Sequence, residues 1–408
     1  MENDKLSCSE QIRLILCYIL QIPIGTWMIL YQAVLPLLEQ DNINLSIVYY
    51  YSGIFLLQIL TGIYSFSMIT LKMNKVTPKV MNRVNIIAII ISMIMTIIGC
   101  ILLGYGNNDN IRGFGLMFVI APSPIYLICS MIVVVPSILK KKSDNVRHIL
   151  NHQEAVNVNS AFNLYGIMAG LMSLTNLTLS QSCIITIIGS IVSGIYLIIN
   201  INTPDDICDD GEYSKIFEYN DNIPFYKKII LLLLTIYGTC TVIVPWTANY
   251  NSIVAAALGV PKNDPVIQNI IELYTNYWTW ASPITVVIIS KIFERICHRN
   301  IMYEIFVLST FVSIVCIGIS TKTSLIIWGF IDSSLPVTFF GSTMLLFIEQ
   351  FKGGVLVQSL FLFVAGIVNY TSLLKTNIYS DPNKYLILTM TEGTIVLILS
   401  IMLLRKNS

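Results

Sequence analysis

An all-α protein that crosses a membrane about twelve times is the fold that three features of this 408-residue sequence predict. Apolar residues make up 55% of the chain and charged residues only 12%, whereas about 25% of the residues in a soluble domain are charged. Apolar runs of about 20 residues, the length that crosses a hydrocarbon core of about 30 Å, recur between short polar breaks. Lysines and arginines gather in alternate breaks. Together these features exclude a chain made of water-soluble domains.

Twelve apolar runs are expected to form the membrane helices. They cover approximately residues 12–36, 47–71, 84–104, 114–139, 156–178, 183–201, 228–247, 267–290, 301–320, 324–348, 355–375 and 385–404. The first run is longer than a signal peptide and lacks a small-residue cleavage site, so we expect it to be a true span.

The lysines and arginines predict the orientation of these spans. With a cytoplasmic N-terminus, the twelve-span topology places 19 of the 24 basic residues on the cytoplasmic side. Cytoplasmic loops of membrane proteins carry such an excess of Lys and Arg. We therefore expect a multi-pass integral membrane protein with both termini in the cytoplasm. The sequence does not indicate which cellular membrane it occupies.

The longest hydrophilic stretch, residues 202–226, divides the predicted spans into two sets of six. It is rich in aspartate and glutamate, which is typical of a solvated linker rather than a binding site. The predicted organisation is thus an N-terminal six-helix bundle (1–201), an acidic cytoplasmic linker (202–226) and a C-terminal six-helix bundle (227–408). Two equal membrane halves are typical of transporters whose substrate site lies between the halves.

Two carboxylates lie inside the predicted spans, Asp332 in the tenth and Glu392 in the twelfth. A carboxylate at a helix centre costs about 2.5–3.5 kcal/mol to insert, so it needs a partner, water or a function. No Lys, Arg or His lies at the centre of any predicted span. Asp332 therefore either titrates, meets a cationic or hydroxylated substrate, or is held by neighbours such as Ser333 and Ser334. Glu392 fits better as a protonated acid that is hydrogen-bonded between helices.

Polar and aromatic residues interrupt two of the predicted spans. Asn276, Thr279 and Trp280 share one face of the eighth span, and such side chains line pockets for rings or sugars. The alternative is an aromatic belt at the membrane interface. Trp27 and Gln32 interrupt the otherwise aliphatic first span. We predict that these five residues, with Asp332, bind the substrate.

Prolines and cysteines give two further expectations. The tripeptide 122–124 (Pro-Ser-Pro) removes backbone donors and is expected to kink the fourth span. The nine cysteines contain no C-x-x-C pair, so neither a metal site nor a cofactor is predicted. Only Cys100 and Cys183 could both approach the outer face, on two neighbouring hairpins, and a disulfide between them is not expected.

The layout of six plus six spans resembles the major facilitator superfamily. Residues 290–299, Ser-Lys-Ile-Phe-Glu-Arg-Ile-Cys-His-Arg, are similar to the cytoplasmic loop motif of that superfamily, roughly G-x-x-x-D-R-x-G-R-R. Glu294 and Arg295 occupy the acid–Arg positions. The resemblance implies that this pair fastens helix ends and shapes the conformational switch.

A second, weaker resemblance is to equilibrative nucleoside transporters. Residues 166–170 (Gly-Ile-Met-Ala-Gly), followed by Asn176-Leu177, look like the fifth span of that family, and Asn276 fits the Asn of its eighth span. Thr279 and Pro283 stand where that family carries Asp and Arg. This resemblance implies a nucleoside or nucleobase permease.

These observations lead to one preferred function and two alternatives. The preferred function is a secondary transporter of a small organic solute that works by alternating access, with a proton as a candidate coupled ion. A Walker loop is absent, which disfavours ATP-driven transport. The alternatives are a nucleoside permease and a polytopic membrane enzyme. The three histidines lie in predicted loops, so we expect no enzyme. The expected partners are the solute and the lipid bilayer; no nucleic acid is expected.

Overall fold

The computed structural model describes mainly the N-terminal half of the chain. The described residues are 7–29, 45, 47–74, 76–130, 177–201, 230, 255, 258–261, 264–266, 269, 391, 395 and 398. The chain divides into two compact units, one with Met1–Asn220 and Met344–Gly366 and the other with Asp221–Thr343 and Ile367–Ser408. All the helices below belong to the first unit.

The regular structure of the described residues is entirely helical. In chain order the helices are α1 (Cys8–Ile19), α2 (Ile22–Ile29), α4 (Ile47–Met73), α5 (Pro78–Tyr105), α6 (Asp109–Ile120), α7 (Ser123–Cys129) and α10 (Leu179–Asn200). Four helical stretches in this part of the chain are long and apolar enough to cross a membrane: Val48–Leu71, Lys79–Tyr105, Asp109–Cys129 and Leu179–Asn200.

Three predicted spans are confirmed with small shifts at their ends. Helices α4, α5 and α10 correspond to the runs at 47–71, 84–104 and 183–201. Helix α5 begins six residues earlier than predicted because Pro78 occupies its first turn, where the missing N–H has no helical partner in any case. Helix α10 begins at a capping box, in which Thr178 and Gln181 each bond the backbone of the other.

Two of the predicted spans are each broken into two helices. The expected kink in the fourth span is confirmed, because α6 ends at Ile120 and α7 begins at Ser123 after Ala121–Pro122. The first span, predicted as one run, also breaks: α1 ends at Ile19 and α2 begins at Ile22. Pro23 lies at the second position of α2, where it fits the start of a new helix and disfavours continuation of α1.

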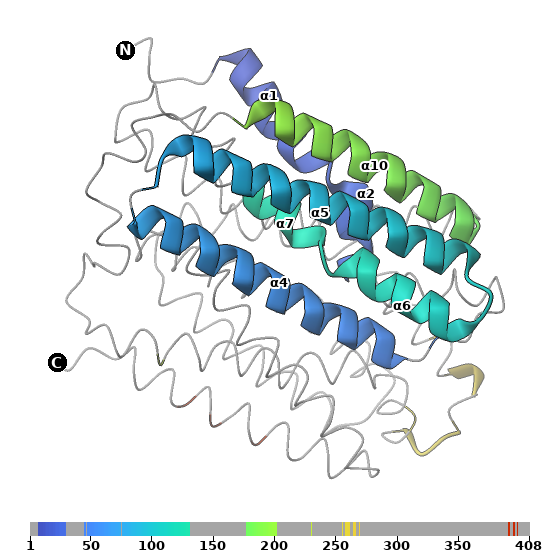
Figure 1. The fold of residues 1–408 in the computed structure, drawn as a ribbon. Helices are drawn as coiled ribbons and strands as arrows, with labels where there is room; N and C mark the ends of the chain where they lie inside the picture. Colours follow the sequence, from blue (N-terminus) through green and yellow to red (C-terminus); the bar gives the residue numbers. More distant parts are fainter. Residues whose placement is uncertain are drawn as a thin grey trace. The chain divides into compact units, whose positions relative to one another are not determined.

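Helices α10, α5, α6 and α4 pack in that order within the first unit (Figure 1). The closest packing is between α5 and α6, where Gly99 and Gly115 meet. A Cβ atom added to Gly99 would lie 2.8 Å from the Val119 backbone nitrogen and 2.9 Å from the Gly115 carbonyl oxygen. Small residues allow helix backbones to approach in this way.

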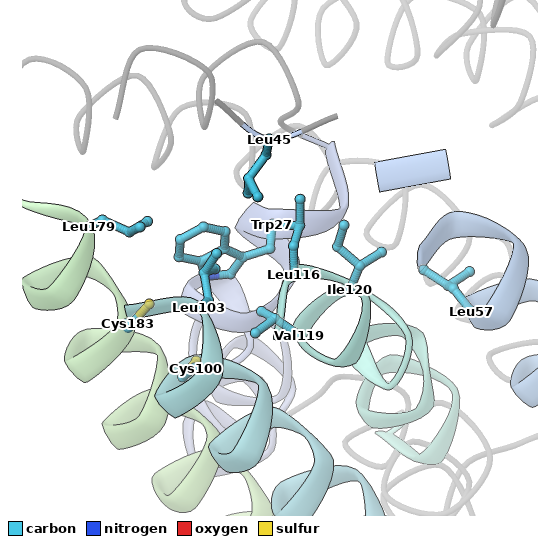
Figure 2. Packing of buried hydrophobic residues seen from close by; sticks show 10 residues of the cluster. All are labelled: Trp27, Leu45, Leu57, Cys100, Leu103, Leu116, Val119, Ile120, Leu179 and Cys183. Carbon is cyan, nitrogen blue, oxygen red and sulfur yellow. The ribbon is translucent and has the colours of Figure 1, made fainter. Parts of the chain in front are cut away.

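A hydrophobic core joins α2, α4, α5, α6 and α10 (Figure 2). Its buried members are Trp27, Leu45, Leu57, Cys100, Leu103, Leu116, Val119, Ile120, Leu179 and Cys183. Cys100 and Cys183, the pair singled out from the sequence, both lie in this one cluster. Both are free thiols rather than a disulfide.

Apolar side chains point outward from the long helices and polar ones point inward. On α5, Ile91 and Ile94 are about half exposed, whereas Asn85, Ser92 and Thr96 are fully buried. On α10, isoleucines and Val192 form the exposed face, and hydroxyl-bearing residues lie on the buried one. This distribution is the reverse of that in a soluble helix, and it suits helices that are surrounded by lipid.

Candidate functional site

The break between α1 and α2 is held by the side chain of Gln21. This residue is 2% exposed. Its Nε2 donates to the Cys17 carbonyl oxygen, to the Tyr126 carbonyl oxygen (3.3 Å) and to the Ser130 hydroxyl. A helix break inside a membrane frees backbone groups that only protein, water or a ligand can satisfy. Gln21 supplies one such partner and ties the break in the first span to α7.

The break between α6 and α7 is likewise satisfied by polar side chains. Ser123 Oγ donates to the Ile120 carbonyl oxygen at 2.8 Å, and Ser130 Oγ donates to that of Tyr126 at 2.9 Å. The Tyr126 hydroxyl bonds Ser190 Oγ of α10 at 2.8 Å. Every residue from 121 to 130 is buried. We call Gln21, Tyr126, Ser130 and Ser190 the break network, because they connect the two helix breaks with α10.

A second polar contact links α7 with α4 and α5. The Tyr64 hydroxyl of α4 donates to Asn85 Oδ1 of α5 at 2.6 Å and lies 3.1 Å from the Cys129 sulfur. All three residues are buried. This contact joins α4, α5 and α7 through groups that carry no formal charge.

The described interior of the first unit offers hydrogen bonds but no charge. Its buried polar residues are glutamine, asparagine, serine and threonine, with tyrosine and cysteine beside them. Within the described residues, no group of three His, Cys, Asp or Glu side chains that could hold a metal ion is present. Gln21 Oε1 is buried and has no hydrogen-bond partner there. Such an atom can accept a hydrogen bond from water or from an uncharged solute.

Among the predicted site residues, the structure describes Trp27. Trp27 is 1% exposed and belongs to the hydrophobic core, where Leu103 and Leu116 lie beside its ring (Figure 2). Its Nε1 donates to Thr186 Oγ1 of α10 at 2.7 Å, so the polar edge of the indole already has a partner in the protein. Its predicted role in substrate binding stays a prediction.

The other predicted site residues lie outside the described residues. These are Gln32, Asn276, Thr279, Trp280 and Asp332 for substrate binding, and Glu294 and Arg295 for the conformational switch. Glu392 and the glycines of the fifth span also lie outside them.

Sequence reasoning did not identify the break network. Gln21 is a polar residue inside an apolar run, two positions before a proline, and this pattern could have drawn attention to it. Tyr126 follows the Pro-Ser-Pro tripeptide but otherwise resembles an ordinary core aromatic. Ser130 and Ser190 carry no local signal, because serines are common in membrane helices. Their roles depend on contacts between residues that are far apart in the chain.

No family model matches the sequence, and no curated protein matches it either. Solved structures match over almost the whole chain. One is the human organic anion transporter MFSD10, with a TM-score of 0.59 and 10% identity over 97% of this chain and 100% of that one. Another is a bacterial homologue of the iron transporter ferroportin, outward-facing with soaked iron, with a TM-score of 0.61 and 10% identity over 98% and 100% of the two chains.

A third similar structure is FucP, a major facilitator superfamily transporter in the outward conformation. Its TM-score is 0.56, with 12% identity over 97% of this chain and 100% of FucP. At these identities the likeness shows the fold alone. It confirms the predicted fold class, an all-α membrane protein of the major facilitator type, whereas the count of twelve spans stays a prediction. The neighbours give no support to the resemblance to nucleoside transporters.

Proposed function

We propose that this chain, an integral membrane protein with the major facilitator fold, is a secondary transporter that moves a small organic solute by alternating access. In this mechanism two helical halves rock about a site near the middle of the membrane, and each side opens in turn. We propose the same halves as in the sequence analysis, 1–201 and 227–408, joined by the linker 202–226. Both termini are cytoplasmic in this proposal.

One observation carries the proposal beyond the fold. Two broken helices of the first unit meet at a buried polar network, in which the Gln21 amide bonds α7 through the Tyr126 carbonyl oxygen and the Ser130 hydroxyl. Irregular backbone at membrane depth is tolerated where it is buried in protein or lines a polar cavity, and broken helices at mid-membrane sites are a feature of transporters. A purely structural membrane protein has no need of two paired breaks.

The remaining site residues enter the proposal as the sequence predicts them. Trp27, Gln32, Asn276, Thr279 and Trp280 contact the solute. Asp332 is the acid that titrates or meets a cationic or hydroxylated group of the solute. Glu294 and Arg295 fasten the cytoplasmic ends of helices in one state and release them in the other.

Uptake by cells that lack endogenous transport tests the proposal. Cells that express the chain are compared with empty cells across nucleosides, sugars, amino acids and organic acids. We expect saturable uptake of one class that unlabelled solute inhibits by competition. Uptake of nucleosides alone would favour the nucleoside permease. Uptake that never saturates would favour a channel, and the absence of any uptake, with the protein folded in the membrane, would contradict the proposal.

The role of Asp332 is tested by the variant Asp332→Asn. If Asp332 carries a coupled proton, the wild-type rate depends on external pH and the rate of the variant does not. An unchanged pH profile in the variant would exclude coupling through Asp332 and would favour facilitated diffusion.

A further inference from the structure

Three polar residues of α4 are buried, and each has a side-chain oxygen without a partner among the described residues. Gln58, Thr61 and Ser65 are 6%, 0% and 0% exposed. Within the described part of the chain, Gln58 Oε1, Thr61 Oγ1 and Ser65 Oγ form no hydrogen bond. Their i, i+3, i+7 spacing places them within an arc of about 60° on the helix, at 100° per residue. We call these three residues the α4 strip.

Other hydroxyls on α4 behave differently. Ser67 Oγ donates to the Ile63 carbonyl oxygen and Thr70 Oγ1 donates to that of Phe66, both at 2.8 Å. Any serine or threonine within a helix can form this bond to a carbonyl oxygen of the preceding turn. Thr61 Oγ1 and Ser65 Oγ do not form it. They are thus free to bond a group from outside the helix.

The α4 strip lies on the buried face of the helix, next to the side that packs on α6 and α7. The packed side carries Gly53, which closely approaches Met117 and Ile120 of α6, and Leu57 of the hydrophobic core. Tyr64 is on the same side, and its hydroxyl is already bonded to Asn85. The contacts of α4 with α6 and α7 therefore leave the three oxygens of the strip unused.

The chemistry of the strip indicates what it can bind. An amide oxygen accepts hydrogen bonds, and each hydroxyl both donates and accepts them. The buried polar side chains described in this unit carry no charge, and a buried charge without a counter-charge is strongly unfavourable. From Gln58 to Ser65 the helix rises by about 10 Å, enough for several polar groups of one solute. The matching ligand group is therefore uncharged and rich in hydroxyl or amide groups, as in a polyol or a sugar.

We propose that the α4 strip, Gln58, Thr61 and Ser65, binds the uncharged, hydrogen-bonding part of the transported solute. This inference rests on the proposed transport function and narrows its substrate class to neutral, hydroxylated or amide-bearing solutes. Buried oxygens without partners reduce stability, and a binding site explains why three of them share one face.

Cysteine labelling tests whether the strip faces a water-filled path. Thr61→Cys and Ser65→Cys are treated in membranes with 2-hydroxyethyl methanethiosulfonate, an uncharged polar reagent, and the added mass is compared with that of the treated wild type. Thiolate, the reactive form, is present where water reaches the sulfur. The control Ile63→Cys lies at the same depth on the exposed face, where Ile63 is 57% exposed, and its thiol stays protonated in lipid. We expect labelling of both strip variants and none of the control.

Transport kinetics test whether the strip binds the solute. In vesicles, D-glucose and myo-inositol serve as neutral probes, benzoate as an anion and choline as a cation. We expect the wild type to transport a neutral probe, and Thr61→Val and Ser65→Ala to raise its KM about threefold to tenfold, the effect of one lost hydrogen bond. The matched controls Thr70→Val and Ser67→Ala remove hydroxyls that bond their own helix, and should change KM by less than about twofold.

The two arms separate failure of this inference from failure of the transport proposal. If the cysteines of the strip stay unlabelled, or react no faster than that of Ile63→Cys, the proposal that the strip binds the solute is wrong. Transport of benzoate or choline alone would also contradict the proposed neutral substrate class, but it would support the proposed transport function. If the wild type carries none of the four probes or of the wider panel, the proposed function fails, and the labelling result still decides whether the strip faces water.

Discussion

The break network and the α4 strip are equally buried but differ in how their polar atoms are bonded. In the break network, Gln21 Nε2, Tyr126, Ser130 and Ser190 bond one another or the ends of helices, and only Gln21 Oε1 lacks a partner among the described residues. In the α4 strip, three oxygens have no partner in the structure. Burial alone thus does not separate polar residues that stabilise the fold from those that await a ligand. The α4 strip differs in that three oxygens without a partner among the described residues share one face of a single helix.

Among the variants predicted here, Gln21→Leu is expected to lower the stability of the protein most. The change removes the amide that joins two helix breaks, and we expect the free energy of unfolding to fall by about 2–3 kcal/mol, since more than one buried group loses its partner. The loss is measured as a lower thermal midpoint in detergent. The control is Gln11→Leu at an exposed position of α1. Equal midpoints for the two variants would show that the network does not stabilise the fold.

Trp27→Phe is expected to have the next largest effect. Phenylalanine keeps an aromatic ring but leaves Thr186 without the indole donor and leaves a small void in the core. We expect a loss of about 1–2 kcal/mol. Combining it with Thr186→Val in a double-mutant cycle isolates the hydrogen bond. An altered solute KM in the same variant would support the proposed contact of Trp27 with the solute, and an unchanged KM would contradict that contact.

A smaller effect is expected at the bond between α7 and α10. Tyr126→Phe and Ser190→Ala each remove one hydroxyl from a single hydrogen bond, so each should cost about 1 kcal/mol. The double variant should cost less than the sum of the two, because the partner of each lost group has also been removed. Strict additivity of the shifts in thermal midpoint would contradict the bond.

The smallest effect on stability is expected within the α4 strip. Thr61→Val replaces a buried, unpartnered hydroxyl with a methyl group of similar shape, so stability should change by less than about 0.5 kcal/mol or increase. Thr70→Val, which breaks a bond to the helix backbone, is the comparison on the same helix. If Thr61→Val destabilised the protein as much as Tyr126→Phe does, Thr61 would belong with the structural residues.

The membrane helices could be predicted well because their signal is local. Helices α4, α5 and α10 match apolar runs whose length and composition alone favour insertion. The break before Ser123 was predictable from two prolines. The break at Gln21 was harder to predict, since the only proline nearby, Pro23, lies inside the helix that follows and the run reads as one continuous span.

The candidate site was less predictable because its contacts join distant residues. Gln21 bonds Ser130, 109 positions along the chain, and Trp27 bonds Thr186, 159 positions along. Trp27 was singled out from the sequence as a substrate residue, and the structure adds a core position and a hydrogen-bond partner that no local pattern contains. Thr61 and Ser65 were not singled out, because hydroxyls on an apolar helix are common and most bond their own backbone.

The sequence by itself determined that this chain is a helical membrane protein, because apolar length and the lack of charge are properties of each segment taken alone. The tertiary structure decided which polar residues are satisfied and which are not. A hydroxyl or an amide has the same chemistry everywhere in the sequence, and its partner is chosen only when helices pack. That packing assigns Gln21 and Tyr126 to the framework and leaves Gln58, Thr61 and Ser65 open to a solute.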